Sequence, residues 1–182
     1  MILNRAWIED LAKQYDKAEE NESILENEIF ESIKGMGSPP LFLTKDILLC
    51  IAEWKAARVK GYVMKNDEQY VKEVTQVSLS TKNEKLKIEI LTLLNGVQIR
   101  MASTILFFCF PEQYTVMDYR AWDSLKALNK INGEIGDTFE CWLKYNEICR
   151  EIAKQNSVSL RKLDKALWQF QGSINSIDKG RE

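Results

Sequence analysis

The chain contains 182 residues, 45% of them hydrophobic and 29% charged, with a formal net charge of −2. This composition is typical of one ordered globular domain or two small packed lobes, and the charge argues against a chain coated along its length by nucleic acid. Histidine is absent, which excludes Ser–His and Cys–His nucleophilic pairs and histidine metal sites, so acid–base chemistry must rest on Asp, Glu, Lys, Tyr or Cys.

The N-terminal part is predicted to be helical on both sides of one clear break. Apolar residues recur at helical spacing over residues 3–18 and 24–33. A cluster of glycines and prolines at residues 35–40 then interrupts the pattern. Thr44 is suited to cap the next helix, which should end near Gly61.

Two consecutive helices are predicted in the next part of the chain. Asn66 is expected to cap a helix that runs to about Ser80. Thr81 and Glu84 have the spacing of a capping box, which predicts a helix that reaches Leu94.

The most apolar helix is predicted from Met101 to Phe110. This segment is apolar on every side except for two hydroxyl side chains, and a helix of that kind belongs at the centre of a domain. Pro111 should end it. Asp118 is expected to cap another helix, which runs to about Asn129.

The C-terminal part is predicted to form two helices, the first capped by Asp137 and the second by Ser159. No segment alternates convincingly between apolar and polar residues, so no strand is predicted. The predicted fold class is therefore all-α, with about nine helices, many joined by short turns. A division into two small helical lobes with a cleft between them is compatible with this pattern.

The turn at residues 94–97 carries the first functional signal. A helix runs into Leu94-Asn95-Gly96-Val97, and the apolar helix follows at once. Free N–H groups and the positive dipole end of that second helix favour an anion such as a phosphate, and Gly96 permits a close backbone approach. The alternative is a plain turn between two helices that happens to contain a glycine.

This segment resembles the helix-hairpin-helix of the DNA glycosylase superfamily, which includes the endonuclease III-like and 8-oxoguanine glycosylase branches. Asp118 lies 22 residues after Gly96, as the family spacing requires. The resemblance is good over residues 91–125 and looser over 44–90. The hairpin pattern is matched by Leu94, Gly96, Val97 and Ala102.

The resemblance implies an all-α unit over residues 1–182, with a helix-hairpin-helix core at about 44–125 that is completed by helices from 1–43 and 130–172. It also implies double-stranded DNA as partner and N-glycosylase activity, in which a base is extruded and its glycosidic bond cleaved. The residues that it places at phosphate are Asn95, Gly96, Val97, Gln98 and Arg100.

The resemblance makes Asp118 the catalytic residue, which stabilises positive charge on the sugar or activates water. Aspartate is also one of the best helix caps, and the two roles are compatible. Aromatic side chains can stack on an extruded base. The pocket candidates are Tyr119, Trp122 and Trp54.

The sequence departs from the family pattern in three ways. Arg100 stands where bifunctional members have a lysine, and arginine stays protonated, so it cannot form a Schiff base. Gln98 stands in place of the second glycine. The iron–sulfur cysteine pattern of many relatives is missing. These departures favour a monofunctional enzyme without a cofactor or metal.

The remaining bulk features suggest an intracellular protein. Cys50, Cys109 and Cys149 fall on apolar faces of predicted helices, and no CxxC pair occurs, so we expect reduced, buried thiols. No stretch approaches the roughly 18–20 apolar residues of a membrane span, and residues 1–16 carry charge too early for a signal peptide. We therefore expect a cytoplasmic protein without a membrane partner.

Charge is unevenly distributed along the chain. Nine acids against four bases give residues 1–38 a net charge of −5, which leaves +3 for the remainder. A modest basic face on the later part is one interpretation, and ordinary solvated helix surfaces are the other.

Two alternatives to an enzyme stay open. The first is a non-catalytic helix-hairpin-helix module, which predicts salt-sensitive DNA binding without base release. The second is an all-α interaction protein that kept only the scaffold, which predicts no DNA binding.

Overall fold

The computed structural model describes the backbone of residues 3–179 and the side chains of residues 3–172. Within residues 3–179 every regular element is helical, and the β-type pairing there is an isolated bridge between Gly37 and Pro40. The predicted all-α fold class is therefore confirmed. In the same part of the chain, no helix is long and apolar enough to cross a membrane.

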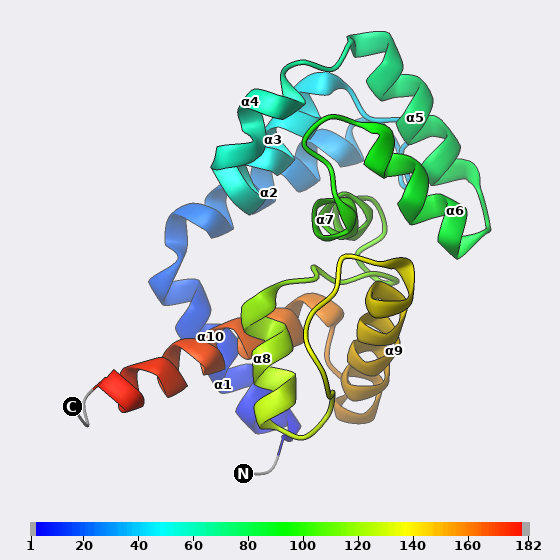
Figure 1. The fold of residues 1–182 in the computed structure, drawn as a ribbon. Coiled ribbons are helices and arrows are strands. Elements are labelled where there is room, and N and C mark those ends of the chain that lie inside the picture. Colours follow the sequence, from blue (N-terminus) through cyan, green and yellow to red (C-terminus); the bar gives the residue numbers. More distant parts are fainter. Residues whose placement is uncertain (1–2, 180–182) are drawn as a thin grey trace.

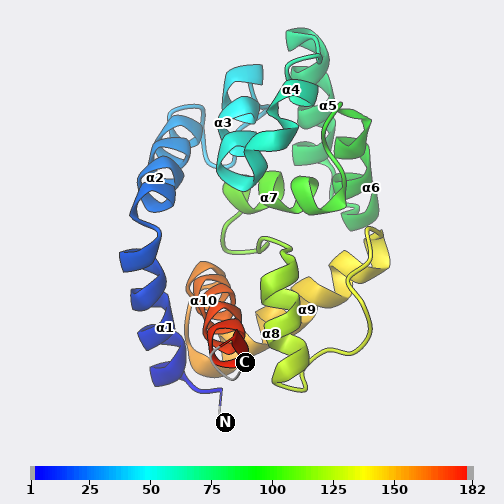
Figure 2. The ribbon, with the colours of Figure 1, turned by 60° about the vertical axis from the view of Figure 1, so that its left-hand side comes forward.

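The helices gather into two groups (Figure 1). The group that we call the hairpin lobe contains α2 (Glu20–Lys34), α3 (Lys45–Ala56), η1 (Ala57–Val59), α4 (Lys60–Val63), α5 (Glu68–Ser80), α6 (Glu84–Glu89), η2 (Ile90–Leu93) and α7 (Ile99–Cys109). The terminal lobe contains α1 (Arg5–Ala18), α8 (Tyr119–Ala127), α9 (Phe139–Asn156) and α10 (Leu160–Lys179). In the second view, α1 and α2 follow one another along one side and connect the two lobes (Figure 2).

Helix α7 is the buried centre of the hairpin lobe, as its apolar sequence predicts. Every residue of α7 except Arg100 is buried. Phe107 and Phe108 contact each other and also contact Phe30 of α2 and Trp54 of α3. Aromatic contacts of this kind add to the large apolar area that the rings bury, so α7 holds several elements in place at once.

Three predicted helix caps are confirmed. The Thr44 hydroxyl accepts a hydrogen bond from the N–H of Ile47, and the Asp118 carboxylate accepts one from the N–H of Arg120. The Ser159 hydroxyl accepts a hydrogen bond from the N–H of Lys162. In each case a side-chain oxygen satisfies an N–H group of the first turn that has no partner within the helix.

Three other predicted caps are wrong by one or two residues. Asp67 rather than Asn66 caps α5, Asn83 rather than Thr81 caps α6, and Thr138 rather than Asp137 caps α9. Each error falls where neighbouring residues have similar capping ability. Local sequence cannot choose between such neighbours, because the choice depends on what else each side chain contacts.

Two helix boundaries and one burial prediction also differ. The helix expected to run to Gly61 ends at Ala56 and continues as η1 and α4. The helix expected to reach Leu94 ends at Glu89 and continues as η2. Cys50 is exposed, contrary to the expectation of a buried thiol, because Leu48, Ile51 and Ala52 form the inward face of α3.

Candidate functional site

A cavity of about 610 Å³ opens beside the hairpin turn. Its wall contains the end of α3, the hairpin turn at residues 94–97 and the first residues of α7. Residues 117–119, at the start of α8, complete the wall. The polar and aromatic residues at this wall include Lys55, Arg58, Tyr62, Asn95, Gln98, Arg100, Asp118 and Tyr119. The cavity therefore brings together three segments that are far apart in the sequence, residues 55–62, 92–101 and 117–119.

The hairpin turn is held from inside the protein by Asn66. This side chain is 3% exposed, donates to the carbonyl oxygens of Val63 and Asn95, and accepts from the backbone N–H of Asn95 at 2.8 Å. The N–H of Asn95 thus points to Asn66 and is not free for a phosphate. Asn66 does not cap a helix because its amide is used to fix this turn.

Gly96 is required by the packing of the turn. Its φ is +82°, a region that L side chains rarely adopt. A Cβ atom at this position would lie 3.0 Å from Cγ2 of Val63 and 3.1 Å from Cβ of Tyr62. The missing side chain therefore lets the turn pack on α4, and this contact within the protein explains the glycine without any ligand.

Replacing Gly96 by alanine should lower the free energy of unfolding. The positive φ alone costs about 1 kcal/mol or more for a non-glycine residue, and the short contacts with Val63 add to that cost. Denaturant unfolding measures the difference. Gly61→Ala is the matched control, because a Cβ there meets nothing within 4 Å, and it should not lower stability. Equal effects of the two changes would contradict this explanation.

The N-terminus of α7 faces the cavity without a capping side chain. Gln98 occupies the cap position and makes no side-chain hydrogen bond to the first turn. The first intrahelical bond runs from the N–H of Ala102 to the carbonyl oxygen of Gln98 at 2.8 Å. The earlier N–H groups are thus available to an anion. Gln98 and Arg100 are exposed beside them, whereas Val97 is buried.

Asp118 is placed by contacts on both sides of it in the chain. The hydroxyl of Ser103 on α7 accepts from the N–H of Met117 at 2.9 Å, and the hydroxyl of Tyr145 on α9 donates to the carbonyl oxygen of Val116 at 3.1 Å. Oδ1 of Asp118 then accepts from the N–H of Arg120 at 2.9 Å. The carboxylate is therefore fixed between the two lobes.

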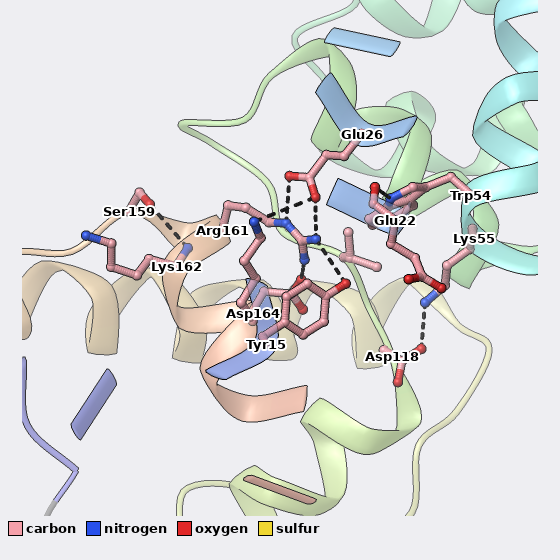
Figure 3. A network of polar contacts seen from close by, with 12 residues as sticks. Tyr15, Glu22, Glu26, Trp54, Lys55, Asp118, Ser159, Arg161, Lys162 and Asp164 are labelled. Atoms are coloured by element: carbon pink, nitrogen blue, oxygen red, sulfur yellow. Dashed lines mark hydrogen bonds and ion pairs between the residues drawn. The ribbon is translucent and has the colours of Figure 1, made fainter. Parts of the chain in front are cut away.

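The second oxygen of Asp118 contacts Lys55. Nζ of Lys55 donates to Oδ2 of Asp118 at 2.7 Å, and the two side chains are only 15% and 17% exposed (Figure 3). Lys55 comes from α3, 63 positions earlier in the chain. No local sequence pattern identifies Lys55 as a partner of Asp118, because none shows that α3 and the start of α8 meet.

A buried charge network lies beside this ion pair (Figure 3). The Arg161 guanidinium contacts the carboxylates of Glu26 and Asp164 and lies over the ring of Trp54. Burial raises the pKa of Asp164 to about 6, and the nearby Asp118 adds to this effect, while Arg161 and Lys55 oppose it. A smaller cavity of about 170 Å³ is lined both by this network and by Asp118.

The three aromatic pocket candidates have different surroundings. Tyr119 is 52% exposed and lies at the wall of the larger cavity. Trp54 packs on the α7 rings and lines the smaller cavity instead. Trp122 is 2% exposed, stacks on Tyr145, and donates to the carbonyl oxygen of Gly133. Trp122 is therefore a core residue and is not in the position expected of a base-stacking side chain.

The structure thus brings the predicted acid and the predicted hairpin residues to one cavity. Tyr62, at 58% exposed, adds a second aromatic ring to its wall. Arg58 and Lys55 add positive charge to the same wall. Among the described residues, no group of three or more Cys, Asp or Glu side chains is placed to hold a metal ion.

Comparisons with known proteins identify a similar fold. No protein-family model matches the chain, and no curated protein matches it. Its structure is similar to that of the Methanocaldococcus jannaschii 8-oxoguanine glycosylase/lyase in complex with a 15mer DNA containing 8-oxoguanine, with a TM-score of 0.52 and 19% sequence identity. The similarity covers 93% of this chain and 82% of that one. The chain therefore has the all-α, helix-hairpin-helix fold of that glycosylase.

Proposed function

We propose that the chain is a DNA N-glycosylase that removes a damaged or modified base from double-stranded DNA with the assistance of Asp118. The observation that carries the proposal is that Asp118 and the uncapped end of α7 share one cavity. The fold is that of a solved glycosylase bound to DNA. The cavity volume of about 610 Å³ lies in the range of sites that enclose small molecules, so it can hold an extruded nucleotide.

Asp118 has the surroundings that the chemistry requires. Cleavage of the glycosidic bond places positive charge on the sugar, and a fixed carboxylate in a poorly solvated site stabilises that charge. Asp118 is held at both oxygens and is 17% exposed. It therefore needs little rearrangement during the reaction. Tyr119 and Tyr62 offer ring faces at the cavity wall for stacking on a base.

The hairpin residues have the surroundings of a phosphate site. The N–H groups at the start of α7 and the guanidinium of Arg100 face the same cavity wall, and both favour a phosphate. Contacts of this kind fix the position of the duplex without reading its sequence. Arg100 is assigned to binding because a guanidinium cannot act as an amine nucleophile.

The Arg100→Gln variant should bind duplex DNA more weakly at every sequence. Loss of one phosphate contact lowers the slope of log affinity against log salt by about 0.9. Fluorescence anisotropy with a labelled duplex at several salt concentrations measures this slope. Arg5→Gln is the matched control, since Arg5 is 62% exposed on α1 and does not line the cavity. An unchanged slope for Arg100→Gln would show that Arg100 does not contact a DNA phosphate.

A panel of duplexes that each carry one modified base tests the proposed activity. Release of a free base, detected by mass spectrometry, is the supporting result. Salt-sensitive binding without base release from the whole panel would favour the non-catalytic binding module instead. No binding of DNA at low salt would favour the other alternative, an all-α interaction protein that kept only the scaffold.

A further inference from the structure

The larger and the smaller cavity meet at one ion pair. Among the residues that the structure describes, the wall of the cavity of about 610 Å³ and the wall of the cavity of about 170 Å³ share two, Lys55 and Asp118. Nζ of Lys55 lies 2.7 Å from Oδ2 of Asp118, and the side chains are 15% and 17% exposed. The pair therefore stands where one cavity adjoins the other.

The contact crosses from one lobe to the other. Lys55 stands in the last turn of α3, in the hairpin lobe, and Asp118 caps α8, in the terminal lobe. Figure 3 shows the two side chains pointing toward one another. A contact between two groups of helices can break without unfolding either group, so this pair has the placement of a gate.

The two halves of the pair are held unequally. Asp118 has a second contact, because its Oδ1 accepts from the N–H of Arg120 at 2.9 Å, and Ser103 and Tyr145 fix the backbone before it. In the part of the chain that the structure describes, Lys55 has one hydrogen-bond partner, Asp118. Its ammonium ends a flexible four-carbon stem. Lys55 is therefore the half that can move.

The larger cavity favours a competitor for the ammonium of Lys55. Its wall also contains Arg58, Arg100 and the uncapped N-terminus of α7, and all of these favour an anion. The oxygens of a phosphate accept hydrogen bonds from an ammonium as the oxygens of a carboxylate do. An anion at this wall can therefore draw Lys55 away from Asp118.

We propose that the Lys55–Asp118 pair is a gate that an anion in the larger cavity opens. With the gate closed, the cavities are separate, and an ammonium at 2.7 Å offsets the charge of Asp118. With Lys55 turned to the anion, the cavities join, and Oδ2 of Asp118 faces them with its charge uncompensated. The inference rests on the proposed function in one respect, because that function makes the anion a DNA phosphate.

The gate makes the charge of Asp118 depend on the presence of the anion. An ammonium 2.7 Å from the carboxylate offsets the field with which the carboxylate stabilises any second cation, so the closed pair is an autoinhibited state. The anion opens the gate by as much as its affinity for the open state exceeds its affinity for the closed state. Asp118 stays in place throughout, because its hydrogen bond to Arg120 does not involve Lys55.

The indole N–H signals in a proton–nitrogen NMR spectrum test the gate without enzymatic turnover. Trp54 and Trp168 line the smaller cavity, whereas Trp142 is buried and lines neither cavity. Single Trp→Phe variants assign these signals. The titrant is potassium phosphate, with potassium chloride at equal ionic strength as the reference, followed by an unmodified DNA duplex. Phosphate and the duplex should shift the Trp54 and Trp168 signals to saturation and leave the Trp142 signal in place.

The Lys55→Met variant is the decisive comparison. It keeps a long unbranched side chain but removes the charge, so the ion pair is absent and the gate is open in the free protein. The Trp168 signal is the cleaner of the two, because Trp54 adjoins the substituted residue. It should already lie near its phosphate-bound position, and its phosphate-dependent shift should fall by at least about fivefold. Lys55→Ala, which also empties the space, should give the same result.

Lys60→Met is the matched lysine control. Lys60 pairs with Glu53 outside both cavities, so this variant should respond to phosphate as the wild type does. Thermal unfolding shows whether each variant is folded.

The outcomes separate the gate from the proposed function. Signals of Trp54 and Trp168 that stay in place with phosphate and with the duplex overturn the gate, whether or not the protein releases a base. A phosphate response that persists in Lys55→Met and Lys55→Ala also overturns it. A response confined to proteins that carry Lys55, in a chain that releases no base from any modified duplex, supports the gate and overturns the proposed function.

Discussion

The Asp118→Asn variant should release base far more slowly than the wild type while it keeps its fold and its affinity for DNA. Asparagine caps a helix about as well as aspartate, so the hydrogen bond to the N–H of Arg120 is preserved. The negative charge is lost, and with it the stabilisation of a cationic sugar. Removing one such electrostatic contact typically lowers kcat by about 100- to 1,000-fold. Binding should stay equal or become tighter, because one negative charge no longer faces the phosphates.

Single-turnover base release on the best substrate of the panel measures this effect, and anisotropy on the same duplex measures binding. Asp67→Asn is the matched control, because Asp67 also caps a helix, α5, and does not line the cavity. It should release base at the rate of the wild type. A fully active Asp118→Asn protein would show that this carboxylate has no catalytic role.

The Arg161→Ala variant should be strongly destabilised. Arg161 is the shared partner of Glu26 on α2 and Asp164 on α10, whose side chains are 7% and 6% exposed. Its removal leaves the Asp164 carboxylate without its ion-pair partner, leaves Glu26 with only Lys165 at 3.9 Å, and also removes the contact with the ring of Trp54. Breaking a buried ion pair in this way costs about 3–5 kcal/mol. Denaturant unfolding at neutral pH measures the loss.

The Arg5→Ala variant provides the contrast for that experiment. Arg5 pairs with Glu9 within α1, with the two side chains 62% and 33% exposed. Pairs in such surroundings contribute about 0–1 kcal/mol. Similar losses in the two variants would show that burial of the Arg161 network does not determine its contribution. Because this network joins α2 to α10 beside the Lys55–Asp118 pair, its loss should also disturb the cavity.

Periodicity and local chemistry were enough to predict the class of the fold and the cap formed by Asp118, whereas its proposed catalytic role came from the resemblance to a family pattern. The apolar sequence of α7 predicts its place at the centre of the hairpin lobe, because a helix without a polar face must be buried. Gly96 and Asp118 were found from a turn signal, a cap signal and their spacing in a family pattern. These features depend on neighbouring residues, so the sequence contains them directly.

Only the tertiary structure decided which residues surround Asp118 and the hairpin turn at residues 94–97. Lys55 reaches Asp118 across 63 positions of sequence, and Asn66 holds the turn across 29. Trp122, which follows Asp118 closely in sequence, faces the core because helical rotation turns it away from the cavity. Local sequence indicates which face of a helix is apolar, whereas the packing of distant helices determines which polar groups meet, and that packing is a property of the whole chain.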